Sequence, residues 1–225
     1  MKQATFKWKL SLPLLVALAG AGSQILAMAQ APAASAVPAV AVTQPVLPLV
    51  DASRELKGRA LVEALRAGGH VLYMRHALQI APTPGPCAGS NLQPAGEVQA
   101  RTVGAAIRAL NIPIGSLRSS EPCRNRDTAR LLGLGEVEIS TDLNPVPATP
   151  DIDIGAARTR QLMQVPKPGT NTLLVSHTHG SRNTAEWMHL ELAEIIVYRP
   201  DGKNPTAPVA RIRVEAWEGL IKAVQ

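Results

Sequence analysis

The sequence predicts an α/β fold, a three-layer arrangement with a mostly parallel sheet and helices on both of its faces. Helical patterns alternate with short strand patterns between residues 51 and 225. The strand patterns are almost continuously apolar, as in strands that are buried on both faces. This alternation is typical of parallel sheets with crossover helices. In such sheets, ligands bind outside the carboxyl ends of the strands.

The predicted helices have recognisable starts or stops. Ser53 could cap the first helix, which carries Ala60, Leu61 and Leu65 on one face and stops at Gly68-Gly69. In the second, we expect Val98, Thr102 and Ala105 to point inward, together with Ile107 or Leu110. The third opens with Pro122, whose missing N–H costs nothing in a first turn. The predicted helices cover residues 53–67, 94–110, 122–132, 155–163 and 181–190.

The predicted strands are short and apolar. HVLYM (70–74) and TLLVS (172–176) are the clearest, and the last two strands are expected to form a hairpin pair. Two loops separate elements: a Pro/Gly-rich loop at 77–96 without charged side chains, and a Pro/Asp loop at 144–153. The strands are predicted at residues 70–74, 116–119, 137–140, 172–176, 194–199 and 209–216.

The N-terminal segment has the pattern of a secretory signal peptide. Three lysines precede the apolar run LSLPLLVALAG, and Ala27-Met28-Ala29 is a small-x-small cleavage site. We therefore predict a signal peptide at 1–29, an uncharged Pro/Ala-rich linker at 30–50 and a domain at 51–225 in the periplasm or outside the cell. An uncleaved membrane anchor is the alternative, but glycines interrupt the run below spanning length. After cleavage, no stable membrane insertion is expected.

Composition narrows the class of partner. The 225 residues carry a formal net charge of +6, and removal of the three lysines of residues 1–29 leaves +3, because this segment holds no acid. So mild a charge does not suggest a nucleic-acid partner. Two cysteines exclude a disulfide-dense scaffold, and 46% hydrophobic with 18% charged residues excludes a disordered chain.

Cationic side chains follow three of the predicted strands. Arg75-His76 follows the first, Arg124 lies in a first helical turn after the second, and His177 follows TLLVS. A parallel sheet brings these ends together, and two helix N-termini would point their N–H groups at the same place. Arginine forks match phosphate oxygens, and a neutral imidazole is a competent nucleophile. The pattern favours phosphoryl transfer without a metal or other cofactor.

Three segments in this order resemble the histidine phosphatase superfamily, which has the phosphoglycerate mutase-like fold. They are YMRHA at 73–77, SEPCRNRDTA at 120–129 and LLVSH at 173–177; Gly96, Gln99 and Ala100 resemble a further family helix. The resemblance spans residues 54–200. It implies that His76 is the nucleophile and becomes phosphohistidine, that Arg75 and Arg124 clamp phosphate, and that His177 contacts phosphate and stabilises the transition state.

The sequence departs from the family pattern at three places. Ala77 replaces the usual glycine after the nucleophile, and Thr178-His179 replaces a small pair after the second histidine. No carboxylate stands clearly in the place of the general acid, where Asn144-Pro145 is found. A missing acid favours substrates with good leaving groups, such as a phosphohistidine or an acyl phosphate. The candidate acids are Asp142, Asp151, Asp153 and Glu186.

We therefore predict a phosphatase that hydrolyses a small phosphorylated substrate. The alternative is a non-catalytic module that binds phosphate or a phosphosugar in the same pocket. A metal-dependent hydrolase is a third hypothesis, because His177 and His179 have His-x-His spacing, although no cysteine or paired carboxylate stands nearby. A mutase is disfavoured because export removes the protein from glycolytic substrates.

The remaining residues of note have simpler interpretations. Cys87 and Cys123 form a candidate disulfide, which would tie the long loop to the phosphate clamp. His70 and His189 are interpreted as surface or edge residues. Trp187 and Trp217 are interpreted as core residues.

Overall fold

A computed structural model describes residues 53–80, 91–145, 160–162, 164–177, 190–203 and 208–225. The chain divides into two units, and all described elements belong to the second, Thr43–Gln225. The predicted signal peptide and most of the linker form the other unit and lie outside the described residues, so both stay predictions. Among the described helices, none combines the length and the apolar character needed to cross a bilayer.

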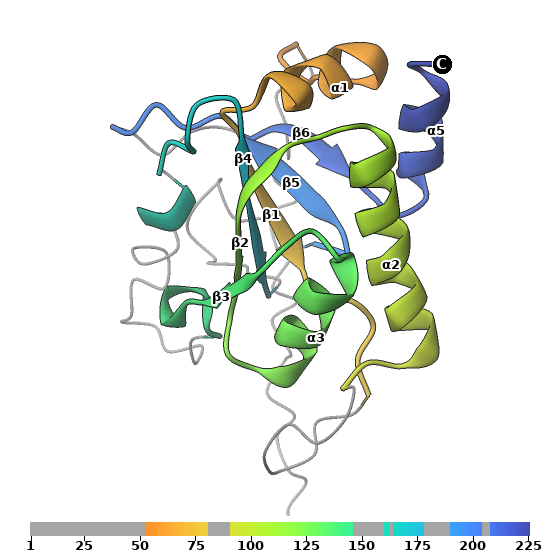
Figure 1. Cartoon of the computed structure of the whole chain (residues 1–225), viewed down its shortest axis with the longest axis vertical. Coiled ribbons are helices and arrows are strands. Elements are labelled where there is room, and N and C mark those ends of the chain that lie inside the picture. Colours follow the sequence, from red (N-terminus) through yellow and green to blue (C-terminus); the bar gives the residue numbers. More distant parts are fainter. Residues whose placement is uncertain (1–52, 81–90, 146–159, 163, 178–189, 204–207) are drawn as a thin grey trace, which may run out of the picture. The chain divides into compact units, whose positions relative to one another are not determined.

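Six strands form one sheet in the order β3-β2-β4-β1-β5-β6 (Figure 1). β1 pairs with β4, β4 with β2 and β2 with β3, all in parallel, while β5 is antiparallel to both β1 and β6. The mostly parallel sheet and the terminal hairpin pair are therefore confirmed. The strands are β1 (Val71–Arg75), β2 (Ile114–Ser119), β3 (Val137–Ile139), β4 (Asn171–Ser176), β5 (Ile195–Tyr198) and β6 (Pro208–Ile212).

Alternating side chains of the strands build a separate core on each face of the sheet. Leu72 and Met74 of β1 belong to a cluster with apolar residues of four helices, whereas Val71 and Tyr73 belong to the opposite cluster. That second cluster includes Leu143, from the 3-10 helix η1 (Thr141–Leu143), and a residue of the short helical stretch 160–162. The four helices of the first cluster are α1 (Gly58–Ala67), α2 (Pro94–Ala109), α3 (Cys123–Leu132) and α5 (Ala216–Lys222).

Helix α1 begins later than the sequence predicts. Its N-cap is Lys57, without a side-chain cap, so the predicted capping role of Ser53 is wrong. The helix stops at Gly68 with φ 81, as predicted from the glycine pair. Its buried face includes Val62, while Ala60 is exposed. Leu61 and Leu65 are buried, as predicted, so the expected face is confirmed except at Ala60.

Helix α2 buries only part of the predicted face: Ile107 and Leu110 are buried, as expected, but the other three predicted residues are not. Val98 is 62% exposed, and Thr102 and Ala105 are exposed as well. The inward side carries small residues, because the helix backbone approaches its neighbours closely. A Cβ added at Gly96 would overlap the carbonyl oxygen of Leu78, and one at Gly104 would overlap that of Leu132. The inward residues are Gly96, Ala100, Val103, Gly104, Ala106 and Ile107.

Gly104→Ala is expected to destabilise the fold by about 2 kcal/mol, because the added methyl group forces α2 away from α3. Gly219→Ala is the matched control. Gly219 lies in α5 with no atom within 4 Å of an added Cβ, so the same substitution there should stabilise by up to about 1 kcal/mol. Urea unfolding of both variants measures the difference. Equal effects at the two positions would contradict the close packing of α2 on α3.

The C-terminal segment and His70 also differ from the sequence-based expectation. β6 ends at Ile212, and the segment from Ala216 is the helix α5 rather than the end of a strand. Trp217 in this helix is 1% exposed, which confirms it as a core residue. His70 is 4% exposed, so its interpretation as a surface or edge residue is wrong. Its backbone N–H donates to the buried side chain of Asn171 (3.1 Å).

Candidate active site

The carboxyl ends of β2, β4 and β1 lie side by side. In the parallel registers, Arg75 of β1 is opposite Ser176 of β4. The backbone N–H of His76 donates to Ser176 O (3.0 Å), and that of Ser120 donates to the preceding residue of β4 (3.0 Å). His76, His177 and Ser120, each following a strand, therefore meet at one edge of the sheet. The predicted convergence of strand ends follows from this register.

The two predicted histidines face each other. Each is 5% exposed, and their ring centroids lie 5.6 Å apart with an angle of 67° between the ring planes. The hydroxyl group of Tyr73 donates to His177 O (2.9 Å), which anchors the chain just after β4. The imidazoles of His76 and His177 thus form a buried pair.

The hydrogen bond of His76 fixes its tautomer. Its Nδ1 lies 2.9 Å from the carbonyl oxygen of Ala77, which can only accept a hydrogen bond. Nδ1 must therefore carry the proton, and in the neutral ring Nε2 keeps its lone pair. A lone pair at Nε2 is what nucleophilic attack requires.

The surroundings of His76 also keep its ring neutral. Burial, together with the smaller effect of the nearby charges of Arg124 and Arg75, lowers the pKa of His76 from 6.5 to about 4. The hydrogen bond to Ala77 acts in the opposite direction but is outweighed. At neutral pH, the imidazole is therefore unprotonated.

This low pKa makes folding stability depend on pH. Below pH 6.5 the unfolded chain takes up a proton that the folded protein resists, so the free energy of unfolding should fall by up to about 3 kcal/mol as the pH drops to about 4. His76→Asn removes this contribution. Urea unfolding between pH 7 and 4 should therefore show a shallower dependence in the variant. Identical pH dependence in both proteins would contradict the lowered pKa.

Arg124 and Ser120 fix the second imidazole. Arg124 Nη2 lies 3.2 Å from His177 Nδ1, and a guanidinium can only donate, so Nδ1 is the acceptor. The proton of the neutral ring then sits on Nε2 and is donated to Ser120 Oγ (3.0 Å). Ser120 belongs to the segment that resembles the histidine phosphatases, but sequence reasoning gave it no role.

Arg75 and Arg124, the two predicted phosphate-binding residues, carry positive charge and are partly buried. Burial lowers the pKa of Arg75, and burial together with the charge of Arg75 lowers that of Arg124. Within the part of the chain that the structure describes, neither guanidinium pairs with a carboxylate. Two neighbouring cations without a countercharge favour an anion, and their planar forks suit phosphate oxygens.

Helix α3 is tied to the strand ends that carry the histidines. Thr128 Oγ1 accepts from the backbone N–H of Ala77 (3.0 Å) and donates to Arg124 O (2.6 Å). Asn125 Nδ2 donates to Ser176 O (2.5 Å). These bonds fix the first turn of the helix, and with it Arg124, against the histidine pair. Thr128 belongs to the segment 120–129 that resembles the histidine phosphatases. The sequence alone does not indicate that its hydroxyl group holds α3 in place.

Asp142, the candidate general acid that lies within the described residues, does not join this group. The carboxylate of Asp142 accepts from Gln161 Nε2 (2.8 Å), and no described contact links it to His76 or His177. Asn144 pairs with Glu121: its Oδ1 accepts from the backbone N–H of Glu121 (2.9 Å), and its Nδ2 donates to the carboxylate. The other three candidates, Asp151, Asp153 and Glu186, lie outside the described residues.

Several further sequence-based expectations concern residues that the structure does not describe. Cys87 lies in such a segment, so its bridge to Cys123 stays a prediction. His179, His189 and Trp187 also lie outside the described residues. Among the described side chains, no group of three His, Cys, Asp or Glu residues is placed to hold a metal ion.

The fold is similar to that of solved phosphatases. The protein histidine phosphatase SixA complexed with tungstate matches with a TM-score of 0.50 and 16% identity, over 64% of this chain and 97% of SixA. Phosphoserine phosphatase from Entamoeba histolytica matches with a TM-score of 0.42 and 15% identity, over 64% of this chain and 96% of that protein. Mycobacterial glucosyl-3-phosphoglycerate phosphatase matches with a TM-score of 0.41 and 16% identity, over 57% of this chain and 89% of that protein. The sequence matches no protein-family model and no curated protein. The likeness to SixA confirms the predicted phosphoglycerate mutase-like fold.

Proposed function

We propose that the protein hydrolyses a small phosphorylated compound through a phosphohistidine intermediate on His76. The observation that supports this most directly is the neutral His76 imidazole. Its Nε2 lone pair lies in a site shared with two guanidiniums that pair with no carboxylate among the described residues. Phosphoryl transfer needs an in-line nucleophile and positive charge around the phosphoryl oxygens. These residues supply both.

The proposed reaction has two steps. His76 Nε2 attacks phosphorus, the bond to the leaving group breaks, and the leaving group departs with the electron pair. The positive charge that develops on the phosphorylated ring is stabilised by the Nδ1–H bond to Ala77 O. Water then attacks the phosphohistidine, which releases phosphate and restores the Nε2 lone pair. Arg75 and Arg124 hold the phosphoryl oxygens in both steps, and His177, whose Nδ1 accepts from Arg124, helps to orient the Arg124 guanidinium.

The substrate is proposed to carry a good leaving group. Asp142, the one candidate acid within the described residues, is engaged with Gln161. Without a proton donor among the described residues, catalysis favours leaving groups that are stable as they depart, such as the imidazole of a phosphohistidine, an acyl group or an aryl group. We propose that the reaction takes place in the periplasm or outside the cell, on the basis of the signal-peptide pattern of the N-terminal segment.

An aryl phosphate tests the proposal, assayed with and without a chelator. Turnover that survives chelation supports the metal-independent route. Loss of turnover on chelation supports a metal-dependent hydrolase instead. Calorimetric binding of phosphate or tungstate without any turnover would support the non-catalytic binding module, and absence of both turnover and binding would refute the proposal.

A further inference from the structure

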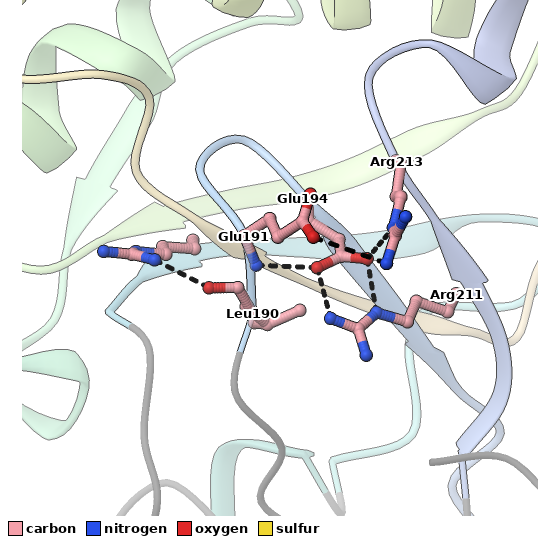
Figure 2. Close-up of polar contacts among 6 residues, drawn as sticks. Leu190, Glu191, Glu194, Arg211 and Arg213 are labelled. Carbon is pink, nitrogen blue, oxygen red and sulfur yellow. Dashed lines mark hydrogen bonds and ion pairs between the residues drawn. The ribbon is translucent and has the colours of Figure 1, made fainter.

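A buried ion pair lies next to the end of β1. The carboxylate of Glu194 is 1% exposed and accepts from Arg211 through both of its oxygens, from Nε to Oε1 and from Nη2 to Oε2 at 2.5 Å. Oε2 also accepts from the backbone N–H of Glu191 (2.7 Å), and Arg213 Nε lies 3.5 Å from Oε1. Figure 2 shows Glu194 between Arg211 and Arg213, with Glu191 beside it. None of these side chains has a part in the proposed chemistry.

The Glu194 carboxylate forms a hydrogen bond within the turn made by residues 190–194. Its bond to the backbone of Glu191 is matched by the backbone bond from Glu194 N to Glu191 O (3.2 Å). Ala193, inside the turn, has φ 59, a left-handed conformation that an alanine rarely adopts. The turn therefore needs a stabilising contact, and the Glu194 carboxylate, fixed by Arg211 of β6, supplies one.

The same turn forms hydrogen bonds with Arg75 and His76, which take part in the proposed reaction. Leu190 O accepts from Arg75 Nη1 (2.7 Å), and Glu194 O accepts from the backbone N–H of Arg75 (3.0 Å). The backbone N–H of Ala193 donates to His76 O (3.2 Å). One turn thus contacts the Arg75 side chain and the backbone on both sides of the bond between Arg75 and His76.

The guanidinium of Arg75 depends on this contact for its direction. Arg75 borders a cavity of about 380 Å³, so packing does not enclose its side chain there. Its Nε is buried without a hydrogen-bond partner among the described residues. The bond from Nη1 to Leu190 O is therefore the contact that orients its fork.

We infer that Glu194, through its ion pair with Arg211, is a positioning residue for Arg75: it fixes the turn whose Leu190 carbonyl oxygen aims the guanidinium at the phosphoryl group. This inference rests on the proposed function, in which Arg75 binds phosphate. Glu194 touches neither substrate nor nucleophile. Its effect reaches the site through Leu190 O and the backbone at the end of β1.

The test is a double-mutant cycle between Glu194→Gln and Arg75→Lys. The glutamine keeps the shape and an acceptor oxygen but removes the countercharge of Arg211, and the lysine keeps a positive charge but lacks the fork that Leu190 orients. We expect Glu194→Gln to lower kcat/KM for an aryl phosphate, and the affinity for tungstate, about tenfold when Arg75 is present and less than about twofold in Arg75→Lys. Glu218→Gln, an exposed ion-paired control in α5, should leave both values unchanged.

Each outcome decides the question. Equal losses in the two backgrounds would show that Glu194 only supports the fold, and would overturn the inference while the proposed function stands. A wild-type protein that neither turns over aryl phosphate nor binds tungstate would instead overturn the proposed function, and the inference with it. If Glu194→Gln does not fold, Arg211→Lys takes its place in the cycle, because it keeps the charge and loses the bidentate contact.

Discussion

His76→Asn is expected to lower kcat/KM for an aryl phosphate by roughly 10⁴-fold or more, as loss of the nucleophile does in other covalent hydrolases. Asparagine can still donate a hydrogen bond toward Ala77 O, but its amide nitrogen is not nucleophilic and cannot replace Nε2 in the attack on phosphorus. Steady-state kinetics with purified protein measures the effect. Turnover of the variant within about tenfold of the wild type would exclude His76 as the nucleophile.

The matched control is His70→Asn. His70 is also a buried histidine and directly precedes β1, the strand that His76 follows. It lies at the opposite end of that strand, so its loss should cost stability without removing chemistry. Tungstate affinity provides a second check, because His76→Asn should still bind the oxyanion through Arg75 and Arg124. Loss of turnover in both histidine variants at a temperature where both are folded would contradict the assignment.

Arg124→Ala is expected to lower kcat/KM by about 10²–10³-fold and to weaken tungstate binding. This is the usual cost of losing one group that stabilises charge in a transition state. The guanidinium both faces the phosphoryl site and donates to His177 Nδ1, so its loss also frees the second imidazole to turn. Arg124→Lys should fall between wild type and alanine, because it keeps the charge and loses the fork.

Arg130→Ala is the control for this experiment. Arg130 lies in the same helix, but its side chain is 63% exposed and its ion pair with Asp127 is long, at 3.8 Å. An exposed pair of this kind contributes at most about 1 kcal/mol, so activity should stay within about twofold of the wild type. If Arg130→Ala lost as much activity as Arg124→Ala, the helix rather than the Arg124 guanidinium would be responsible.

The sequence predicts the site better than it predicts the helices that support it. Arg75, His76 and His177 follow apolar strands, and once the strands are parallel their positions follow from the register. The inward face of α2 could not be found in this way. It consists largely of glycine and alanine, which carry little hydrophobic signal, while the more apolar Val98 faces solvent.

Contacts made by backbone groups also escape prediction from sequence. Leu190 O holds the Arg75 guanidinium, but a carbonyl oxygen is present in every residue and leaves no mark in the sequence. The sequence predicts Glu194 at the start of a strand, and nothing in its neighbours indicates a buried ion pair with Arg211. Long-range pairings of this kind depend on the packed structure. The side chains of the reaction can be predicted, whereas the groups that orient them cannot.

Trapping the phosphorylated protein tests the central claim most directly. Wild-type protein is mixed with an aryl phosphate and quenched within the first turnovers in alkaline denaturant, which preserves phosphohistidine. It is then mapped by mass spectrometry and by phosphorus NMR. The expected result is one phosphoryl group on His76, attached at Nε2, that is lost in acid and absent from His76→Asn. A phosphoryl group on another residue or at Nδ1, or continued turnover without any phosphoenzyme, would contradict the proposed reaction.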